Sequence, residues 1–149
     1  TTLSRQLAYF VTIYSGMQMA ADRPFIYEHR FPSEFQFIRD VPTNFNITLP
    51  LAGEIGEYYV VARQDRNSRD WYIGGVTDEN SRRMHINLDF LEQGVVYEAT
   101  IYADAENAHY RENPFAIIKQ TKNVGCTDSL DLYMAPGGGF AIKLKLKQN

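Results

Sequence analysis

Apolar and polar residues alternate along much of the C-terminal two-thirds of the chain. Over residues 143–147 lysine alternates with leucine. Successive side chains of a β-strand point to opposite faces of a sheet, so this pattern predicts a strand with one buried and one solvated face. Sheets with one solvated face are typically antiparallel. Similar segments, separated by short polar turns, predict strands at 45–51, 58–63, 71–76, 83–88, 96–103, 115–121, 130–134 and 140–147.

The N-terminal part of the chain follows a different pattern. Apolar residues recur at helical spacing over residues 3–14 and cover more than one face, which predicts a helix buried on several sides. Residues 17–21 form a short apolar run that favours a buried parallel strand, with a short helix as the alternative. Ser33 is expected to cap a further short helix that ends at Val41, because a residue before proline resists helical dihedrals. The expected order is helix, strand, helix.

This change of pattern predicts a boundary between two units. Several short, evenly spaced strands bury their apolar faces most simply as two packed sheets, so we expect residues 43–149 to form an antiparallel two-sheet β-sandwich. Residues 1–42 are expected to belong to a different unit. The predicted fold class is therefore mainly β, with a helix-strand-helix segment before the sandwich.

Composition narrows the classes of function. The 149 residues are 44% hydrophobic and 22% charged, as in ordinary folded domains, and their formal net charge is −3. This balance supplies no basic surface for nucleic acid or an anionic membrane. No apolar run reaches the ~20 residues that span a bilayer, and the N-terminus lacks the features of a signal peptide. Cys126 is the only cysteine, so neither an internal disulfide nor a cysteine-based zinc site is expected.

The run Gly137-Gly138-Gly139 has two interpretations. Phosphate-binding loops are glycine-rich, but they open a helix, whereas a strand is predicted after this run. The alternative is a tight hairpin between Met134 and Phe140, in which glycine supplies positive φ angles. We therefore predict a structural hairpin.

Acidic and imidazole side chains offer few candidates for catalysis. Glycosidases use two carboxylates. Three short-range pairs of acids occur: Glu54 with Glu57, Asp89 with Glu92, and Asp104 with Glu106. All three fall in or beside predicted turns, where solvated acids are common, so none is predicted to be catalytic. The histidines are not spaced as metal ligands and are expected at the surface: His29, His85 and His109.

Aromatic residues on the predicted strands suggest two further hypotheses. Trp71 and Tyr72 point to opposite faces of one strand, with Trp71 the better core residue. Exposed Tyr72, Tyr102 and Tyr133 would form a sugar-stacking platform, as in a carbohydrate-binding module. Alternatively, the chain is a structural or interaction domain that self-associates through the helix at 3–14, which is apolar over more surface than a free helix should expose.

Short motifs spread over nearly the whole chain share their order with those of one enzyme family. They are Gln18-Met19-Ala20-Ala21-Asp22, Phe35-Gln36-Phe37-Ile38, Asp40-Val41-Pro42-Thr43, Gly53-Glu54-Ile55-Gly56-Glu57-Tyr58, Val61-Ala62-Arg63, Asp70-Trp71-Tyr72-Ile73-Gly74, Thr77-Asp78, Tyr97-Glu98-Ala99 and Met134-Ala135-Pro136-Gly137-Gly138-Gly139-Phe140-Ala141. In this order they resemble the C-terminal part of glycoside hydrolase family 97, which comprises bacterial α-glucosidases and α-galactosidases. Gly16, where the family usually has proline, and the loop at 105–113 depart from the family pattern.

The resemblance implies a (β/α)₈ catalytic barrel followed by a C-terminal β-sandwich. Residues 1–42 would then be the last helix, strand and helix of the barrel, and residues 43–149 the sandwich that braces it. Active sites of such barrels lie at the carboxyl ends of the strands, so Asp22 becomes a candidate substrate-binding residue. The alternative role for Asp22 is a cap, or a partner for Arg23 or Arg39.

The same resemblance implies the activity of the parent enzyme. That activity is hydrolysis of a terminal α-linked glucose or galactose in an oligosaccharide, through an oxocarbenium-like transition state. The catalytic acid, the second carboxylate and the calcium ligands are expected upstream of Thr1. No cofactor is therefore expected to bind this chain, and the chain alone is expected to be inactive. The implied location of the parent is the periplasm, the cell envelope or the exterior, and the implied partners are the upstream barrel and the oligosaccharide.

Overall fold

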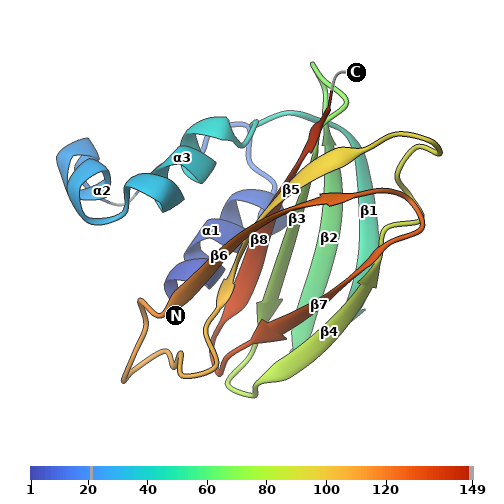
Figure 1. Ribbon diagram of the computed structural model, residues 1–149. Coiled ribbons are helices and arrows are strands. Elements are labelled where there is room, and N and C mark those ends of the chain that lie inside the picture. Colours follow the sequence, from blue (N-terminus) through green and yellow to red (C-terminus); the bar gives the residue numbers. More distant parts are fainter. Residues whose placement is uncertain (21, 148–149) are drawn as a thin grey trace.

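The computed structural model describes residues 1–20 and 22–147, which form three layers (Figure 1). The helices are α1 (Leu3–Thr12), α2 (Pro24–Arg30) and α3 (Pro32–Asp40). The strands are β1 (Phe45–Glu54), β2 (Tyr58–Asp65), β3 (Trp71–Thr77), β4 (Arg82–Asn87), β5 (Tyr97–Asp104), β6 (Ile117–Val124), β7 (Ser129–Met134) and β8 (Gly139–Leu146). The middle layer is a six-stranded antiparallel sheet in the order β1-β2-β3-β8-β5-β6. A sheet of β4 and β7 covers one of its faces, and α1 lies against the other.

The eight strands predicted between residues 45 and 147 all form, and the mainly β class is confirmed. Alternation sets the orientation of β8, in which Ile142 and Leu144 are fully buried whereas Lys145 is exposed. The core between the two sheets is made of apolar side chains from both, among them Trp71 and Leu130. The prediction that Trp71 points inward is therefore confirmed.

A second core lies on the opposite face of the six-stranded sheet. There α1 places Leu7 and Val11 against the sheet, and Phe37 of α3 adds to the same cluster. The helix approaches β3 closely at Gly74, where a Cβ atom would lie 2.9 Å from the carbonyl oxygen of Ala8. The predicted helix is thus confirmed from Leu3 to Thr12, whereas Ile13 and Tyr14 lie outside it and are exposed. Its buried residues lie on the face against the sheet, and not on several sides as expected.

The segment between α1 and α3 differs from the prediction. Residues 17–20 form no strand, and Met17 and Met19 are 76% and 82% exposed. A buried parallel strand needs neighbouring strands, and every strand pair in the described part of the chain is antiparallel. Residue 21, the last of the predicted strand, lies outside the described residues.

The two short helices begin at prolines rather than at a polar cap. Sequence reasoning missed α2, whose first residue is Pro24, and α3 begins at Pro32 with Phe31 as its N-cap. Proline suits the first helical position because its φ angle is already helical and its missing N–H is not needed there. Ser33 is therefore inside α3 and not its cap, while the predicted end before Val41 is confirmed.

The triple glycine does not close a hairpin. It joins β7, which pairs with β4, to β8, which belongs to the larger sheet, so it carries the chain from one sheet to the other. Gly137 has the positive φ angle, 64°. Gly138 is needed for a different reason, since a Cβ atom there would overlap Oδ2 of Asp104. The division into units 1–42 and 43–149 stays a prediction, and no described helix is long and apolar enough to cross a membrane.

Candidate functional site

Asp22, the predicted substrate-binding residue, lies at the surface just before α2. Its Oδ1 accepts a hydrogen bond from the backbone N–H of Arg23 at 2.7 Å. Neither Arg23 nor Arg39 forms an ion pair with it among the described residues. The N-cap of α2 is Arg23, and no side chain forms a capping hydrogen bond there, so this contact does not make Asp22 a helix cap. A role of Asp22 near substrate stays a prediction.

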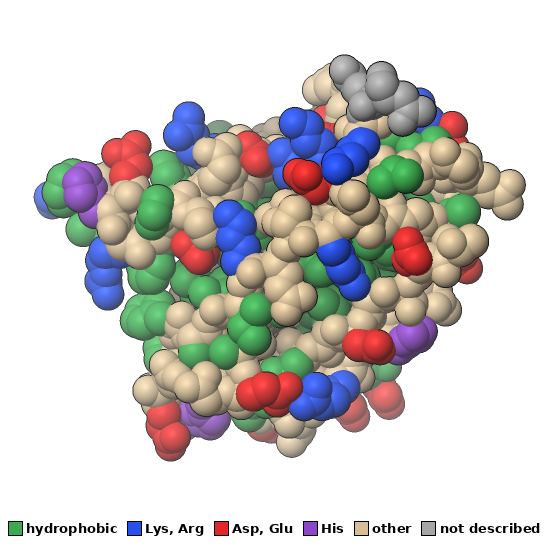
Figure 2. All heavy atoms as spheres, viewed as in Figure 1, with side chains coloured by type: hydrophobic (Ala, Val, Ile, Leu, Met, Phe, Trp, Pro, Cys, Tyr) green, Lys and Arg blue, Asp and Glu red, His purple; other side chains and the backbone are tan. Residues whose placement is uncertain are grey.

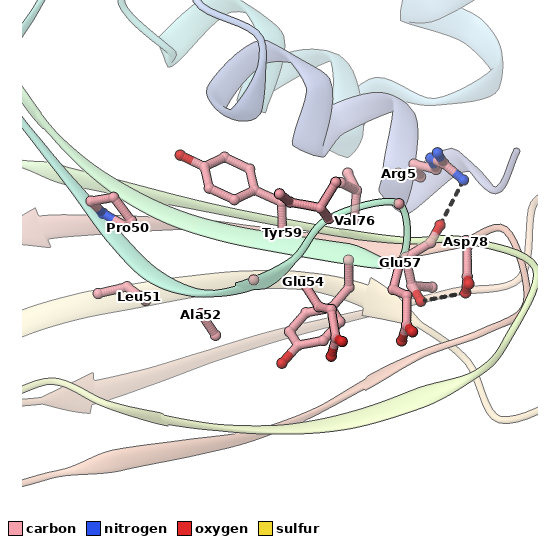
Figure 3. A pocket seen from close by; sticks show the side chains of 14 residues that line it. Arg5, Pro50, Leu51, Ala52, Glu54, Glu57, Tyr59, Val76 and Asp78 are labelled. Atoms are coloured by element: carbon pink, nitrogen blue, oxygen red, sulfur yellow. Dashed lines mark hydrogen bonds between the residues drawn. The ribbon is translucent and has the colours of Figure 1, made fainter.

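A hollow of about 670 Å³ lies at the turn between β1 and β2 (Figure 3). Glu54, Glu57 and Asp78 line it, and Arg5 reaches its edge from α1. The Arg5 guanidinium donates to the backbone carbonyl of Thr77 at 2.7 Å. The hollow therefore brings carboxylates from two turns together, which sequence spacing alone could not establish.

The chemistry of this hollow is that of an ion-pair network. Arg82 donates to Glu57 at 2.6 Å and also pairs with Asp78. The hydrogen bond from Arg82 holds the pKa of Asp78 well below its usual range. Asp78 is therefore ionised at neutral pH and cannot supply the proton that glycoside hydrolysis requires. These contacts link the β1–β2 turn to β4, which gives the carboxylates at the hollow a structural role.

The prediction that all the paired acids are solvated is wrong for Asp104. It is 2% exposed at the end of β5, and its Oδ2 accepts hydrogen bonds from the backbone N–H groups of Ala135 and Gly139 at 2.9 and 2.8 Å. Burial raises the pKa of Asp104, and these bonds, with the hydroxyls of Thr2 and Ser4, oppose that rise. The carboxylate thus fastens the glycine-rich connection between the sheets, beside the start of α1.

The prediction of an exposed aromatic platform is wrong for two of its three tyrosines. Tyr72 and Tyr102 are each 3% exposed. Their hydroxyls donate to the backbone carbonyls of Asp40 and Ser33, both at 2.9 Å. Burial raises the pKa of Tyr102 to about 12 and raises that of Tyr72 as well. Both rings fasten α3 to the sheet and are not available to stack on sugar.

An apolar hollow of about 480 Å³ separates α1 from α2 and α3. Its rim includes Ile13, Met17 and Met19, which are 58%, 76% and 82% exposed. Helix α2 has no buried residue, and Figure 2 shows hydrophobic side chains gathered below it. Exposed apolar surface of this kind is typical of protein–protein contacts, membrane contacts and ligand-binding grooves. Sequence reasoning found the apolar helix but not this hollow, because α2 was missed.

Metal-ligating side chains do not gather in the described part of the chain. No three His, Cys, Asp or Glu side chains lie close enough together to hold a metal ion, considering residues 1–20 and 22–147. His29 and His85 are exposed, and Nδ1 of His85 lies 2.8 Å from an oxygen of Asp131.

Comparisons with known proteins found a matching family model and several relatives. Residues 44–145 match the family model described as glycosyl-hydrolase 97 C-terminal, oligomerisation. A retaining alpha-galactosidase of Bacteroides thetaiotaomicron is 38% identical, over 97% of this chain and 21% of the relative.

Solved structures extend the match to the helices. A glycoside hydrolase family 97 enzyme of Pseudoalteromonas sp. strain K8, solved with panose, superimposes with a TM-score of 0.96 at 43% identity, over 99% of this chain and 23% of that enzyme. A beta-arabinopyranosidase shares the fold, with a TM-score of 0.73 at 21% identity, over 96% of this chain and 21% of that structure. This chain spans about a fifth of these proteins. It belongs to glycoside hydrolase family 97, and its residues 44–145 match the C-terminal domain of that family.

Proposed function

We propose that residues 43–149 brace the catalytic barrel of a family 97 α-glycosidase, and that residues 1–42 are the last segment of that barrel and dock on the rest of it. The observation that supports the proposal is the exposed apolar surface at the hollow between α1 and α2, with Met17 and Met19 on its rim. The matched family model is the C-terminal part of proteins about five times longer, so in those relatives a larger part of the enzyme precedes it. A catalytic domain placed there would cover these side chains.

The activity proposed for the whole protein is hydrolysis of a terminal α-linked galactose or glucose. Two relatives support this class: a retaining alpha-galactosidase, and a family 97 enzyme solved in complex with panose. We propose that the catalytic carboxylates and any calcium ligands lie in the catalytic domain. The location that the family resemblance supports is the periplasm, the cell envelope or the exterior.

Substitution of the exposed methionines tests the docking proposal. In the full-length protein, Met17→Ser with Met19→Ser is expected to shorten the half-life of glycosidase activity at elevated temperature, because docking loses apolar burial. The same change in the isolated domain is expected to leave its melting temperature unchanged, since both side chains are already exposed there. Ile55→Ser is the matched control, because Ile55 is 103% exposed at the β1–β2 turn. Equal half-lives for wild type and the double variant would contradict docking through this surface.

Association between copies is a second candidate, supported by the match of residues 44–145 to a family of oligomerisation domains. The face of α1 that carries Leu7 and Val11 is buried against the sheet. The exposed Ile13, which directly follows the helix, lies on the surface that is free for a second copy. We propose that any self-association of the isolated domain uses this apolar surface. Light scattering on a concentration series tests the idea. A monomer at high concentration would contradict it without affecting the docking proposal.

A further inference from the structure

Arg63 of β2 is a buried cation on the helix-covered face of the six-stranded sheet. The residue is 6% exposed, and its guanidinium carbon lies 5.3 Å from the ring centroids of both Tyr14 and Phe45. The two rings hold the guanidinium by cation–π contacts and keep water away from its faces. The position of the guanidinium is therefore set by two residues from separate parts of the chain.

No anion compensates this charge in the part of the chain that the structure describes. Arg63 takes part in none of the ion pairs there, and its Nε has no hydrogen-bond partner. Arg5, which also has an unpartnered Nε, differs because its terminal nitrogen donates to Thr77. Burying a charge without a partner is costly, so buried arginines are normally paired. Aromatic contacts replace only part of the lost hydration.

The place of Arg63 in the fold indicates where the partner comes from. Tyr14, which stacks on the guanidinium, is itself 63% exposed and directly follows Ile13 on the rim of the apolar hollow. A domain that covers this rim would also cover the outer side of Tyr14 and reach the edge of the guanidinium. The unpaired cation is thus continuous with the proposed docking surface.

We infer that Arg63 receives an acidic side chain of the catalytic domain, so that docking completes a buried ion pair. This inference rests on the proposed function and deepens it by naming the chemistry of the contact. A guanidinium suits the position because its faces stack on rings while its edge presents parallel N–H groups to a carboxylate. A lysine ammonium would offer neither the planar stack nor the fork.

The inference predicts opposite effects of one substitution in two contexts. In the full-length protein, Arg63→Met is expected to lower the melting temperature of this domain by about 5 °C or more, because the partner carboxylate is left buried and unpaired. In the isolated domain the same change is expected to leave the melting temperature equal or higher, because an uncompensated buried charge is removed. Arg63→Lys is expected to recover only part of the loss in the full-length protein. The exposed Arg66, changed to Met, is the matched control and should alter neither context.

Three results would overturn the inference. An equal drop in melting temperature in both contexts would show that Arg63 stabilises this domain by itself. No drop in either context would refute the proposed ion pair. Full recovery by lysine would contradict the need for a planar fork. If the serine variants of Met17 and Met19 weaken docking and Arg63→Met does not, the docking proposal stands and the ion pair is refuted. If neither has an effect, both proposals fail.

Discussion

Removal of the Asp104 carboxylate tests the account of how the two sheets are joined. In Asp104→Ala, the backbone N–H groups of Ala135 and Gly139 lose their acceptor, which lies at 2.9 and 2.8 Å in the wild type. Hydrogen bonds to a charged group contribute about 1.5–3 kcal/mol each. The gain from no longer burying a carboxylate, whose pKa burial raises, offsets part of this. We therefore expect a net loss of about 2–4 kcal/mol in the free energy of unfolding.

Denaturant unfolding of the domain measures this loss directly. Glu106→Ala is the matched control, because Glu106 lies two residues further on, with a side chain that is 65% exposed and paired with Arg83. Its loss is expected to stay within about 0.5 kcal/mol, as for other surface ion pairs. The slope of the transition should be the same in both variants if only stability changes. A loss in Asp104→Ala no larger than in Glu106→Ala would refute the assigned role of the buried carboxylate.

Three further changes test other parts of the account. Burial raises the pKa of Asp104 above its ordinary value of 3.8, so the folded state binds this proton more tightly than the unfolded state does. The stability that this difference contributes is fully present below pH 3.8 and is lost as the pH rises through the raised pKa. Asp104→Asn should therefore flatten that decline, measured as the free energy of unfolding against pH, and an unchanged profile would contradict the assignment. Gly138→Ala should lower the free energy of unfolding by about 2–4 kcal/mol, because its Cβ atom would overlap Oδ2 of Asp104. The control Gly16→Ala, with open space around the residue, should lower it by less than about 0.5 kcal/mol. Equal losses would contradict the close approach at Gly138. Tyr72→Phe should lower the free energy of unfolding by about 1 kcal/mol, because the Asp40 carbonyl loses its hydrogen-bond donor. Titration of the wild-type domain with maltooligosaccharides should show no saturable binding up to millimolar concentration. Saturable binding that is lost in Tyr72→Ala, which removes the ring, would restore the sugar platform.

The strands were the most predictable part of the fold, because alternation is a local property. Lysine alternates with apolar residues in β8, and the pattern alone places Leu144 in the core. The partner of each strand is not local. Residues 134–140 look like a hairpin in sequence, but β7 pairs with β4, so the same glycines cross between sheets. Turn chemistry indicates where the chain bends and not which strand it joins next.

The candidate sites were harder to predict, because burial depends on what covers a strand. Tyr72 faces away from the sandwich core as expected, yet α1 and α3 cover that face and bury it. Asp104 follows a strand beside a turn, where acids are usually solvated, but the start of α1 and the glycine-rich connection enclose it. Arg63 is a third case, because nothing in the sequence indicates that this charged side chain is buried. In all three cases the deciding neighbour is distant in sequence.

Assay of glycosidase activity tests the central claim, that this chain is the non-catalytic C-terminal domain of a family 97 enzyme. The full-length protein and this chain alone would be compared on nitrophenyl α-galactoside and nitrophenyl α-glucoside, at equal molar concentrations. The account predicts turnover by the full-length protein on at least one of the two, and none above background by residues 1–149. Turnover by this chain alone, abolished by substitution of its own carboxylates such as Glu54 or Asp78, would contradict it.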